Sequence, residues 1–208
     1  METQINGNPG HNNTYQEGTI EKVDTLYNNP TIYQQCAVTR LSAYFKRLTE
    51  EVSTNTRAPV KEELMEYTNR LDSNPSIEDK LLAAGFTASS IQEAGRNMNT
   101  FTRKAKQYIC YPSAQNIILL LLARIKNEFI TNIYPLIEDG IPQRTIMEQI
   151  RSRIVRPIME TLNADGVSDE HLCFAEDHIY GILYYLTAQK YISWVGRKRT
   201  YSIEQNCA

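Results

Sequence analysis

The amino-acid sequence predicts a mainly α-helical protein: a helical bundle around a buried central helix, ending in a helix plus a small β-hairpin, a winged-helix-like end. The first observation behind this prediction is an unbroken apolar run from Ile117 to Ala123. A helix that is apolar around most of its circumference has to be covered on several sides. The second is the recurrence of apolar residues every three or four positions along most of the chain. The third is a β-branched and aromatic segment near the C-terminal end, typical of a short hairpin.

Length and composition suggest one helical domain preceded by a leader. We predict a flexible Asn- and Gly-rich leader at residues 1–30, because it contains few residues that could join a core. Residues 31–208 are predicted to form a single helical domain with a C-terminal β-hairpin. The 22 Lys and Arg against 24 Asp and Glu give a formal net charge of −2, which provides no general attraction to nucleic acid or anionic membranes.

Apolar spacing predicts a succession of helices along the domain. They are a helix after Thr31 that includes 38–48, then 60–71, 77–84, 87–108, the central 111–137, 144–162, one capped by Ser168, and 176–188. Gly85 is placed to end its helix in a left-handed conformation. Pro135 should end the central helix because it lacks an N–H, and Pro157 should kink or restart its own helix.

The C-terminal segment is predicted to form the hairpin. Residues 191–195 would form one strand, 196–199 the turn, and 200–203 the returning strand. The tip carries Arg197, Lys198 and Arg199, the candidate contact to nucleic-acid phosphates. The other interpretation of this tip is an exposed turn with solubilising charges.

Aromatic residues near the end of the chain form the candidate partner surface. Trp194 is the only tryptophan, and it alternates with Ile192, so we expect it to pack the hairpin against the helix before it. An aromatic patch available to a protein partner is the alternative interpretation. The candidate partner-surface residues are Tyr180, Tyr184, Tyr185, Tyr191 and Trp194.

Catalytic and metal-binding motifs are lacking in the sequence. It contains no glycine-rich phosphate loop, nucleophile elbow or HExxH pair, so we predict a protein without enzymatic activity, cofactor or metal. On one helix, His171 and His178 would lie about 10 Å apart along the axis, too far to share an ion. A weaker alternative is an enzyme whose site uses dispersed residues such as Glu176, Asp177 and His178.

Cysteine spacing points to a cytoplasmic protein. Cys36, Cys110, Cys173 and Cys207 are widely scattered, without a CxxC pair. The sequence also shows no signal peptide and no apolar stretch of membrane-spanning length. We therefore expect reduced thiols in the cytoplasm and no membrane association.

Three blocks of the sequence are similar to a known family. They are Lys80, Leu81 and Ala83, then Ser113–Gln115 with Ala123–Arg124, and the ending HIYGILYYLTAQKYISW at 178–194. Over about residues 31–194 the chain resembles the C-terminal helical module of bacterial three-component ABC-ATPase (ABC-3C) conflict systems. Residues 188–191, Ala-Gln-Lys-Tyr, depart from the Gly-Asn-Cys-His that this family tends to have there.

The resemblance implies a function in a complex. It implies a non-catalytic docking or sensing subunit of a phage-defence-type assembly, with an ABC-type ATPase and a small middle component as partners. The alternative, from another class, is a winged-helix-like nucleic-acid-binding protein that uses the basic residues 197–199.

Overall fold

In the computed structural model, the described residues are 31–68, 76–167 and 169–196. The chain divides into two compact units, Met1–Ala37 and Val38–Ala208, and the packing described below is that of the second. The predicted leader, residues 69–75, Ser168, the predicted hairpin tip at 197–199 and the predicted returning strand at 200–203 lie outside the described residues.

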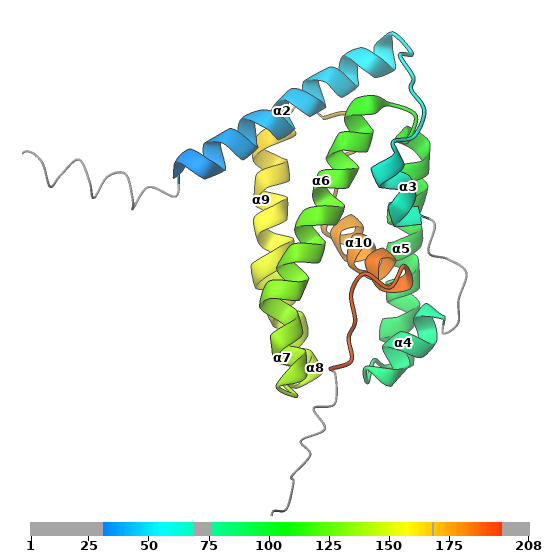
Figure 1. The fold of residues 1–208 in the computed structure, drawn as a ribbon, viewed down its shortest axis with the longest axis vertical. Helices are drawn as coiled ribbons and strands as arrows, with labels where there is room; N and C mark the ends of the chain where they lie inside the picture. The colour runs from blue at the N-terminus through cyan, green and yellow to red at the C-terminus, as the bar shows by residue number, and fades with distance from the viewer. Residues whose placement is uncertain (1–30, 69–75, 168, 197–208) are drawn as a thin grey trace, which may run out of the picture. The chain divides into compact units, whose positions relative to one another are not determined.

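The described part of the chain is helical (Figure 1). Its elements are α2 (Thr31–Ser53), α3 (Glu62–Thr68), α4 (Ile77–Ala83), α5 (Ala88–Tyr108), α6 (Pro112–Glu128), η1 (Phe129–Ile133), α7 (Tyr134–Glu138), α8 (Gln143–Ile150), η2 (Arg151–Val155), α9 (Arg156–Asp165) and α10 (Glu176–Ala188). The labels η1 and η2 denote π-helical turns. The helical class predicted from the sequence is confirmed.

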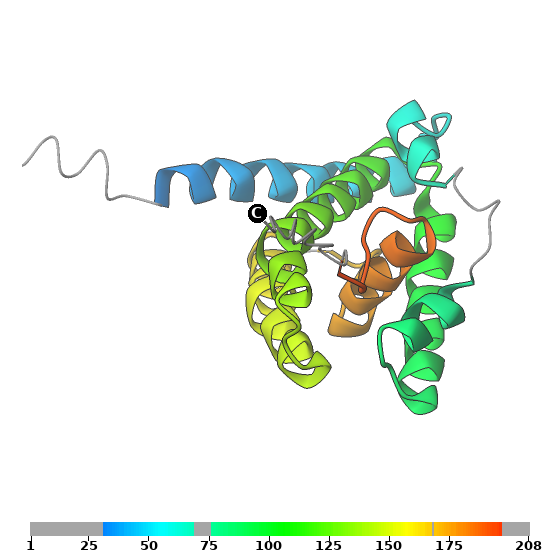
Figure 2. The same cartoon turned by 60° about the horizontal axis from the view of Figure 1, so that its bottom comes forward.

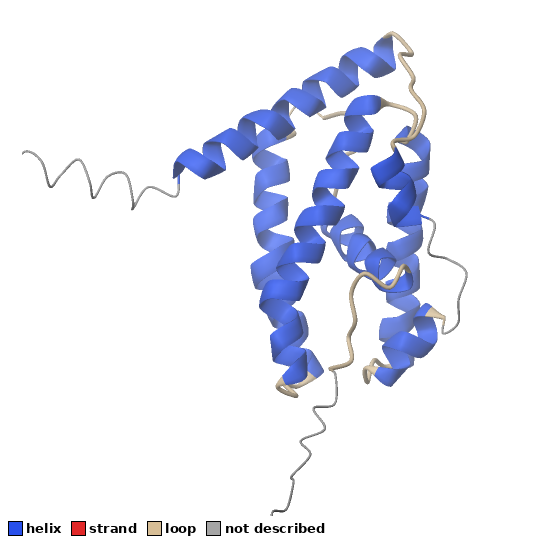
Figure 3. Cartoon of the chain, in the orientation of Figure 1, coloured by secondary structure: helices blue, strands red, loops and turns tan. Residues whose placement is uncertain are grey.

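The predicted β-hairpin with its winged-helix-like end is wrong. Within the described residues the chain forms no strand, and Tyr191–Gly196 follows α10 as a loop (Figure 3). Ile192 and Trp194 are buried, whereas Ser193 and Val195 are exposed. A strand with one buried face produces the same alternation, so the pattern could not distinguish a strand from a loop with two anchoring side chains.

Helix α6 lies at the centre of the core, as predicted. Most of its apolar side chains are buried, whereas Leu119, Leu120 and Ala123 are half-buried, and it contacts α3, α5 and α10 as well as both π-helical turns. Helix α10 lies between α5 and α6, which is visible from two directions (Figures 1 and 2). The buried residues of α6 are Ser113, Ala114, Gln115, Ile117, Ile118, Leu121, Leu122 and Ile125.

Pro135 does not end the central helix, contrary to the prediction. A π-helical turn precedes it, in which the N–H of Tyr134 donates to the oxygen of Phe129, and α7 then continues to Glu138. The wider turn accommodates a residue that lacks an N–H and would collide with the preceding turn of an α-helix. Pro157 is preceded by the same arrangement, with Arg156 N–H donating to Arg151 O, so α8 is interrupted by a π-helical turn before this proline and the helical path then continues as α9.

Left-handed residues close several helices with one hydrogen-bond pattern. Asn55, Gly85, Gly140 and Lys190 have φ of 52°, 83°, 72° and 63° and follow α2, α4, α7 and α10. After α4, Gly85 N donates to Leu82 O at 2.9 Å and Phe86 N to Leu81 O at 3.0 Å. This pair of bonds is the Schellman motif, which satisfies carbonyls at a helix end. The predicted role of Gly85 is confirmed.

The helix predicted after Ser168 is absent from the described residues. Instead, the Asp169 carboxylate accepts hydrogen bonds from the backbone N–H groups of His171, Leu172 and Cys173, at 3.0, 2.9 and 2.7 Å. These contacts resemble a helix N-cap, but the backbone turns left-handed at Cys173, with φ of 41°. Residues 169–175 therefore form a loop in which one side chain accepts hydrogen bonds from three backbone N–H groups.

Candidate functional site at the end of helix α10

Helix α10 approaches α5 most closely at Gly181. A Cβ atom at this position would lie 2.3 Å from the carbonyl oxygen of Asn97 and 2.8 Å from Cβ of Phe101. Only glycine fits such a close approach of two helices. The other apolar side chains on this face of α10 are also buried, namely those of Ile179, Ile182, Leu183 and Leu186. Gly181 therefore allows α10 to pack closely on α5, and this packing determines the position of the C-terminal end of α10.

Lys80 of α4 caps that end. Its Nζ donates to the carbonyl oxygens of Thr187 and Ala188, at 3.0 and 2.9 Å. A cation is favoured at a helix C-terminus, where the backbone dipoles point their negative ends. Burial, and then the positive charge of Lys190, lower the pKa of Lys80. Lys80 belongs to one of the three sequence blocks, but its role could not be predicted because its partners are carbonyl groups more than a hundred residues away.

Trp194 anchors the loop that follows α10. Its ring meets Phe86 and Phe129 edge to face, with centroids 5.1 Å apart in both pairs, and stacks against Tyr184 at 6.2 Å. Its indole Nε1 donates to the hydroxyl of Thr187 at 2.8 Å. The predicted packing of Trp194 against the helix bearing Tyr184 is observed, although a loop rather than a hairpin presents the ring.

Tyrosines join the end of α10 to α3. The Tyr191 hydroxyl donates to Glu66 O at 2.8 Å, and the Tyr185 hydroxyl donates to Tyr67 O at 3.1 Å. The Tyr67 and Tyr191 rings lie 4.7 Å apart, and Lys126 Nζ lies 5.8 and 5.6 Å from their centroids. Burial, and then the neighbouring Tyr191, raise the pKa of Tyr185 to about 12. The Tyr185 hydroxyl is therefore un-ionised and acts as a donor within the fold.

The aromatic residues predicted as a partner surface divide into two groups. Tyr184 and Trp194 are buried, with exposed fractions of 5% and 7%. Tyr180, Tyr185 and Tyr191 are half-buried. The nucleic-acid candidates Arg197, Lys198 and Arg199 lie outside the described residues.

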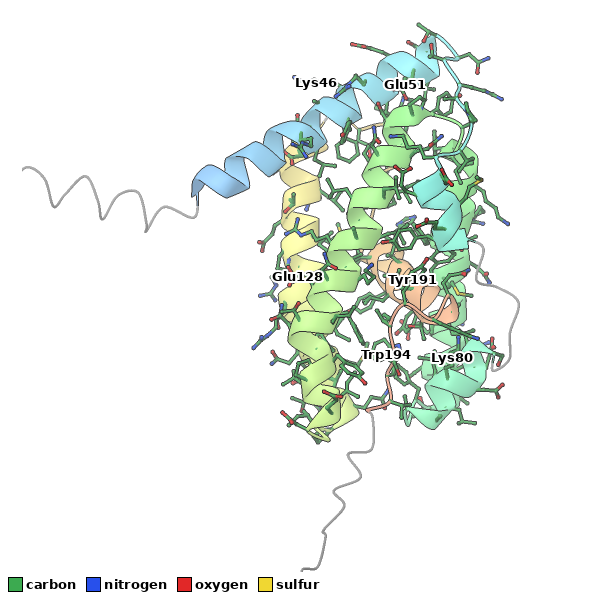
Figure 4. All side chains as sticks on the ribbon, viewed as in Figure 1. Lys46, Glu51, Lys80, Glu128, Tyr191 and Trp194 are labelled. Carbon is green, nitrogen blue, oxygen red and sulfur yellow. The ribbon has the colours of Figure 1, made fainter. Side chains whose placement is uncertain are left out.

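Two cavities flank Trp194. Figure 4 labels Trp194 and the neighbouring Lys80. One has a volume of about 230 Å³ and lies between α4, the α7–α8 turn and the loop, with Phe86, Ile141 and Val195 in its wall. The other, of about 420 Å³, lies between α4 and the end of α10, with Lys80 and Ile192 in its wall. The loop after α10 therefore borders two open cavities that have apolar side chains in their walls.

The acidic and histidine-rich segment does not form a compact centre. His171 lies in the loop before α10 and His178 within α10, so the two do not share a helix, contrary to the assumption made from the sequence. Glu176 and Asp177 are exposed in the first turn of α10. Across the described ranges, no three His, Cys, Asp or Glu side chains are placed to hold a metal ion together. None of the described helices is long and apolar enough to cross a membrane.

His178 closes the N-terminal end of α10, and this contact predicts a pH dependence. Its Nδ1 accepts a hydrogen bond from Ala175 N at 3.0 Å. Burial, and then the positive charge of Lys104, lower the pKa of His178 below its usual 6.5, although Asp177 acts in the opposite direction. The unfolded chain therefore binds more protons than the folded chain just below pH 6.5, so stability falls as the pH drops from 6.5 toward the lowered pKa.

The variant His178→Gln isolates this effect, because glutamine offers Ala175 an acceptor that does not titrate. We expect the native chain and the variant to have equal free energies of unfolding at pH 8. As the pH falls to 5, the free energy of unfolding of the native chain should drop increasingly below that of the variant, and this difference is the deficit. The deficit stays well below the limit of about 1.4 kcal/mol per pH unit for one proton, because solvent screens this half-exposed group. Urea titrations at several pH values measure the free energies of unfolding. If the native chain and the variant depend on pH in the same way, protonation of His178 does not weaken the fold.

The comparisons with known proteins place this region in a family. The family described as C-terminal domain 9 of the ABC-three component (ABC-3C) systems matches residues 76–194. The comparisons with curated proteins and with solved structures give no match. The matched segment begins at the N-cap of α4 and ends at Trp194, so it contains Lys80, α10 and the anchored loop. It covers more than half of the chain, and the resemblance found in the sequence is confirmed. The chain thus belongs to the family of C-terminal domain 9 of the ABC-3C systems and is a component of such a multi-protein system.

Proposed function

We propose that the chain is a non-catalytic docking or sensing subunit of its ABC-3C system and acts in defence against phage. The observation that carries this proposal is the family match over residues 76–194, since the family is a domain of systems with several components. Its partners under this proposal are an ABC-type ATPase and a small middle component. The contacts in the matched region support the non-catalytic part of this proposal. The polar groups of Lys80, Thr187 and Trp194 form hydrogen bonds within the chain, so they serve the fold rather than a reaction.

The proposed docking surface surrounds the cavity of about 230 Å³ beside Trp194. Val195 and Ile141 line this cavity and are 48% and 36% exposed, and Leu82, 64% exposed, directly precedes Ala83 in its wall. Protein interfaces concentrate their binding energy where an apolar side chain of one partner fills a pocket of the other. We therefore propose that an apolar side chain of a partner protein of the same system enters this cavity. Trp194, one of the candidate partner-surface residues, forms part of its wall.

Co-expression tests the proposal directly. The full chain, tagged, is produced together with the ABC-type ATPase and the middle component of its own system, and the purified material is separated by size-exclusion chromatography. We expect the chain to elute with at least one of them in a complex of fixed stoichiometry. An unrelated ABC-type ATPase serves as the control for nonspecific association. Elution of the chain alone in the presence of both components would contradict a docking function.

A further inference from the structure

The two cavities beside Trp194 adjoin each other but differ in charge. Ala83, Trp194 and Val195 lie in the walls of both. The cavity of about 230 Å³, which the proposed docking surface surrounds, has no charged side chain among the described residues that line it. The cavity of about 420 Å³ has two lysines in its wall, Lys80 and Lys190. A partner segment that enters the first cavity therefore lies next to a second cavity that carries positive charge.

Lys80 is a half-buried cation without a carboxylate partner. Within the described ranges it forms no ion pair with an Asp or Glu side chain. Its Nζ donates to the oxygens of Thr187 and Ala188, and because an ammonium group has three N–H donors, one donor remains. The carbonyl dipoles at a helix end offset only part of one positive charge. An anion that reaches this ammonium group would add a charge-assisted hydrogen bond.

Lys190 adds to the positive charge of the larger cavity. After burial, its charge is the second cause of the lowered pKa of Lys80, so the two ammonium groups act on each other. Lys190 has a left-handed φ of 63°, and the residues with left-handed φ after α2, α4 and α7 are Asn55, Gly85 and Gly140. Helix ends of this kind favour glycine and asparagine, so the backbone conformation does not explain a lysine here.

Asp79 is the one acidic side chain among the described residues that line this cavity. Its Oδ2 accepts hydrogen bonds from Ser76 N and Ser76 Oγ, at 3.2 and 3.0 Å, and so caps the N-terminal end of α4. Two lysines against one aspartate leave one positive charge in excess in the wall. This excess complements a single carboxylate better than a chain of phosphates.

We propose that the docking segment of the partner protein carries an Asp or Glu next to the apolar side chain that enters the cavity of about 230 Å³, and that this carboxylate accepts hydrogen bonds from Lys80 and Lys190 in the adjoining cavity. The inference rests on the proposed docking function and adds the chemistry of the partner. Ile192 and Val195 give the larger cavity apolar walls as well. A peptide can present apolar and acidic side chains together, whereas a nucleic-acid backbone offers phosphates alone.

The test is the dissociation constant for the purified ABC-type ATPase or middle component of the same system, whichever binds the full chain. We expect Lys190→Glu to weaken binding about tenfold, because it places a carboxylate against that of the partner. Lys46→Glu makes the same change on an exposed lysine of α2, away from Lys80 (Figure 4), and should leave the constant unchanged. Salt raised from about 50 mM to about 500 mM should weaken the native complex severalfold, since it screens exposed charges.

Lys80→Met should also weaken binding. Because it removes two hydrogen bonds at the end of α10, its melting temperature is measured as well, and Lys190→Glu decides the outcome if this variant is unstable. If Val195→Glu weakens binding but Lys190→Glu and salt do not, the acidic contact is overturned while docking stands. Absence of binding by the native chain overturns docking and this inference with it. Binding of labelled DNA or RNA at about 150 mM salt that Lys190→Glu abolishes would assign the lysines to phosphates and overturn the acidic segment.

Discussion

The variant Gly181→Ala is expected to lower the free energy of unfolding by about 3 kcal/mol or more, although alanine favours helix more than glycine does. The added methyl group would lie 2.3 Å from a backbone oxygen of α5 and 2.8 Å from Cβ of Phe101. Neither atom belongs to the far end of a flexible side chain, so α10 as a whole has to move away from α5. That movement also loosens the contacts of Ile182 and Leu183, which are buried on the same helix. Urea unfolding followed by far-ultraviolet circular dichroism measures the loss.

Gly95 provides the matched control within the neighbouring helix. It lies in the middle of α5, and a Cβ atom there would meet nothing within 4 Å. Gly95→Ala should therefore stabilise the protein by about 0.5–1 kcal/mol, through the lower conformational entropy of the unfolded chain and the better helix propensity. The same small effect at both positions would show that α10 and α5 do not approach each other as closely as described.

The second large effect is expected at Trp194. Trp194→Ala removes a ring that contacts Phe86, Phe129 and Tyr184 and is only 7% exposed, so we expect a loss of about 3–5 kcal/mol. Trp194→Phe keeps an aromatic ring but removes the hydrogen bond to the Thr187 hydroxyl, and it should cost less, about 1–3 kcal/mol. Circular dichroism has to follow unfolding here, because Trp194 is the only tryptophan and its removal abolishes the intrinsic tryptophan signal.

Val195→Ala is the control for the tryptophan variants. The residue is adjacent to Trp194 but 48% exposed, so its truncation should change the free energy of unfolding by less than about 0.5 kcal/mol. A loss of less than about 1 kcal/mol for Trp194→Ala would mean that the loop after α10 is not anchored by this ring.

Helices were predictable here wherever one periodic face enters the core. The stripe Leu41, Phe45 and Leu48 and the apolar run of α6 both lie where the spacing predicts. Pro135 and Pro157 have the same local chemistry, yet the sequence suggested an end for one and a restart for the other. A π-helical turn before each proline lets the helical path continue, and this adjustment depends on packing around the helix rather than on the local sequence.

The candidate site was less predictable, because its features depend on contacts between distant segments. Trp194 and its packing partner Tyr184 could be identified because a buried aromatic near a tyrosine-rich helix is a local pattern. Lys80 reaches backbone carbonyls of α10, and such carbonyls leave no signature in the sequence. The buried amides of Gln115 and Gln189 likewise differ only after folding, when one meets three backbone groups and the other meets none.

We propose that this chain docks to a protein of its own system through the apolar rim beside Trp194. The most direct test is the dissociation constant for the purified ABC-type ATPase or middle component, measured with Val195→Glu and Val167→Glu in parallel. Both changes put a carboxylate on an exposed valine, but Val195 lines the docking cavity, whereas Val167, 85% exposed, follows α9, whose C-terminal end lies far from α4 (Figure 1). We predict about tenfold or greater weakening for Val195→Glu and an unchanged constant for Val167→Glu. Equal constants for the native chain and both variants would contradict the proposed surface, and the absence of binding by the native chain would contradict docking itself.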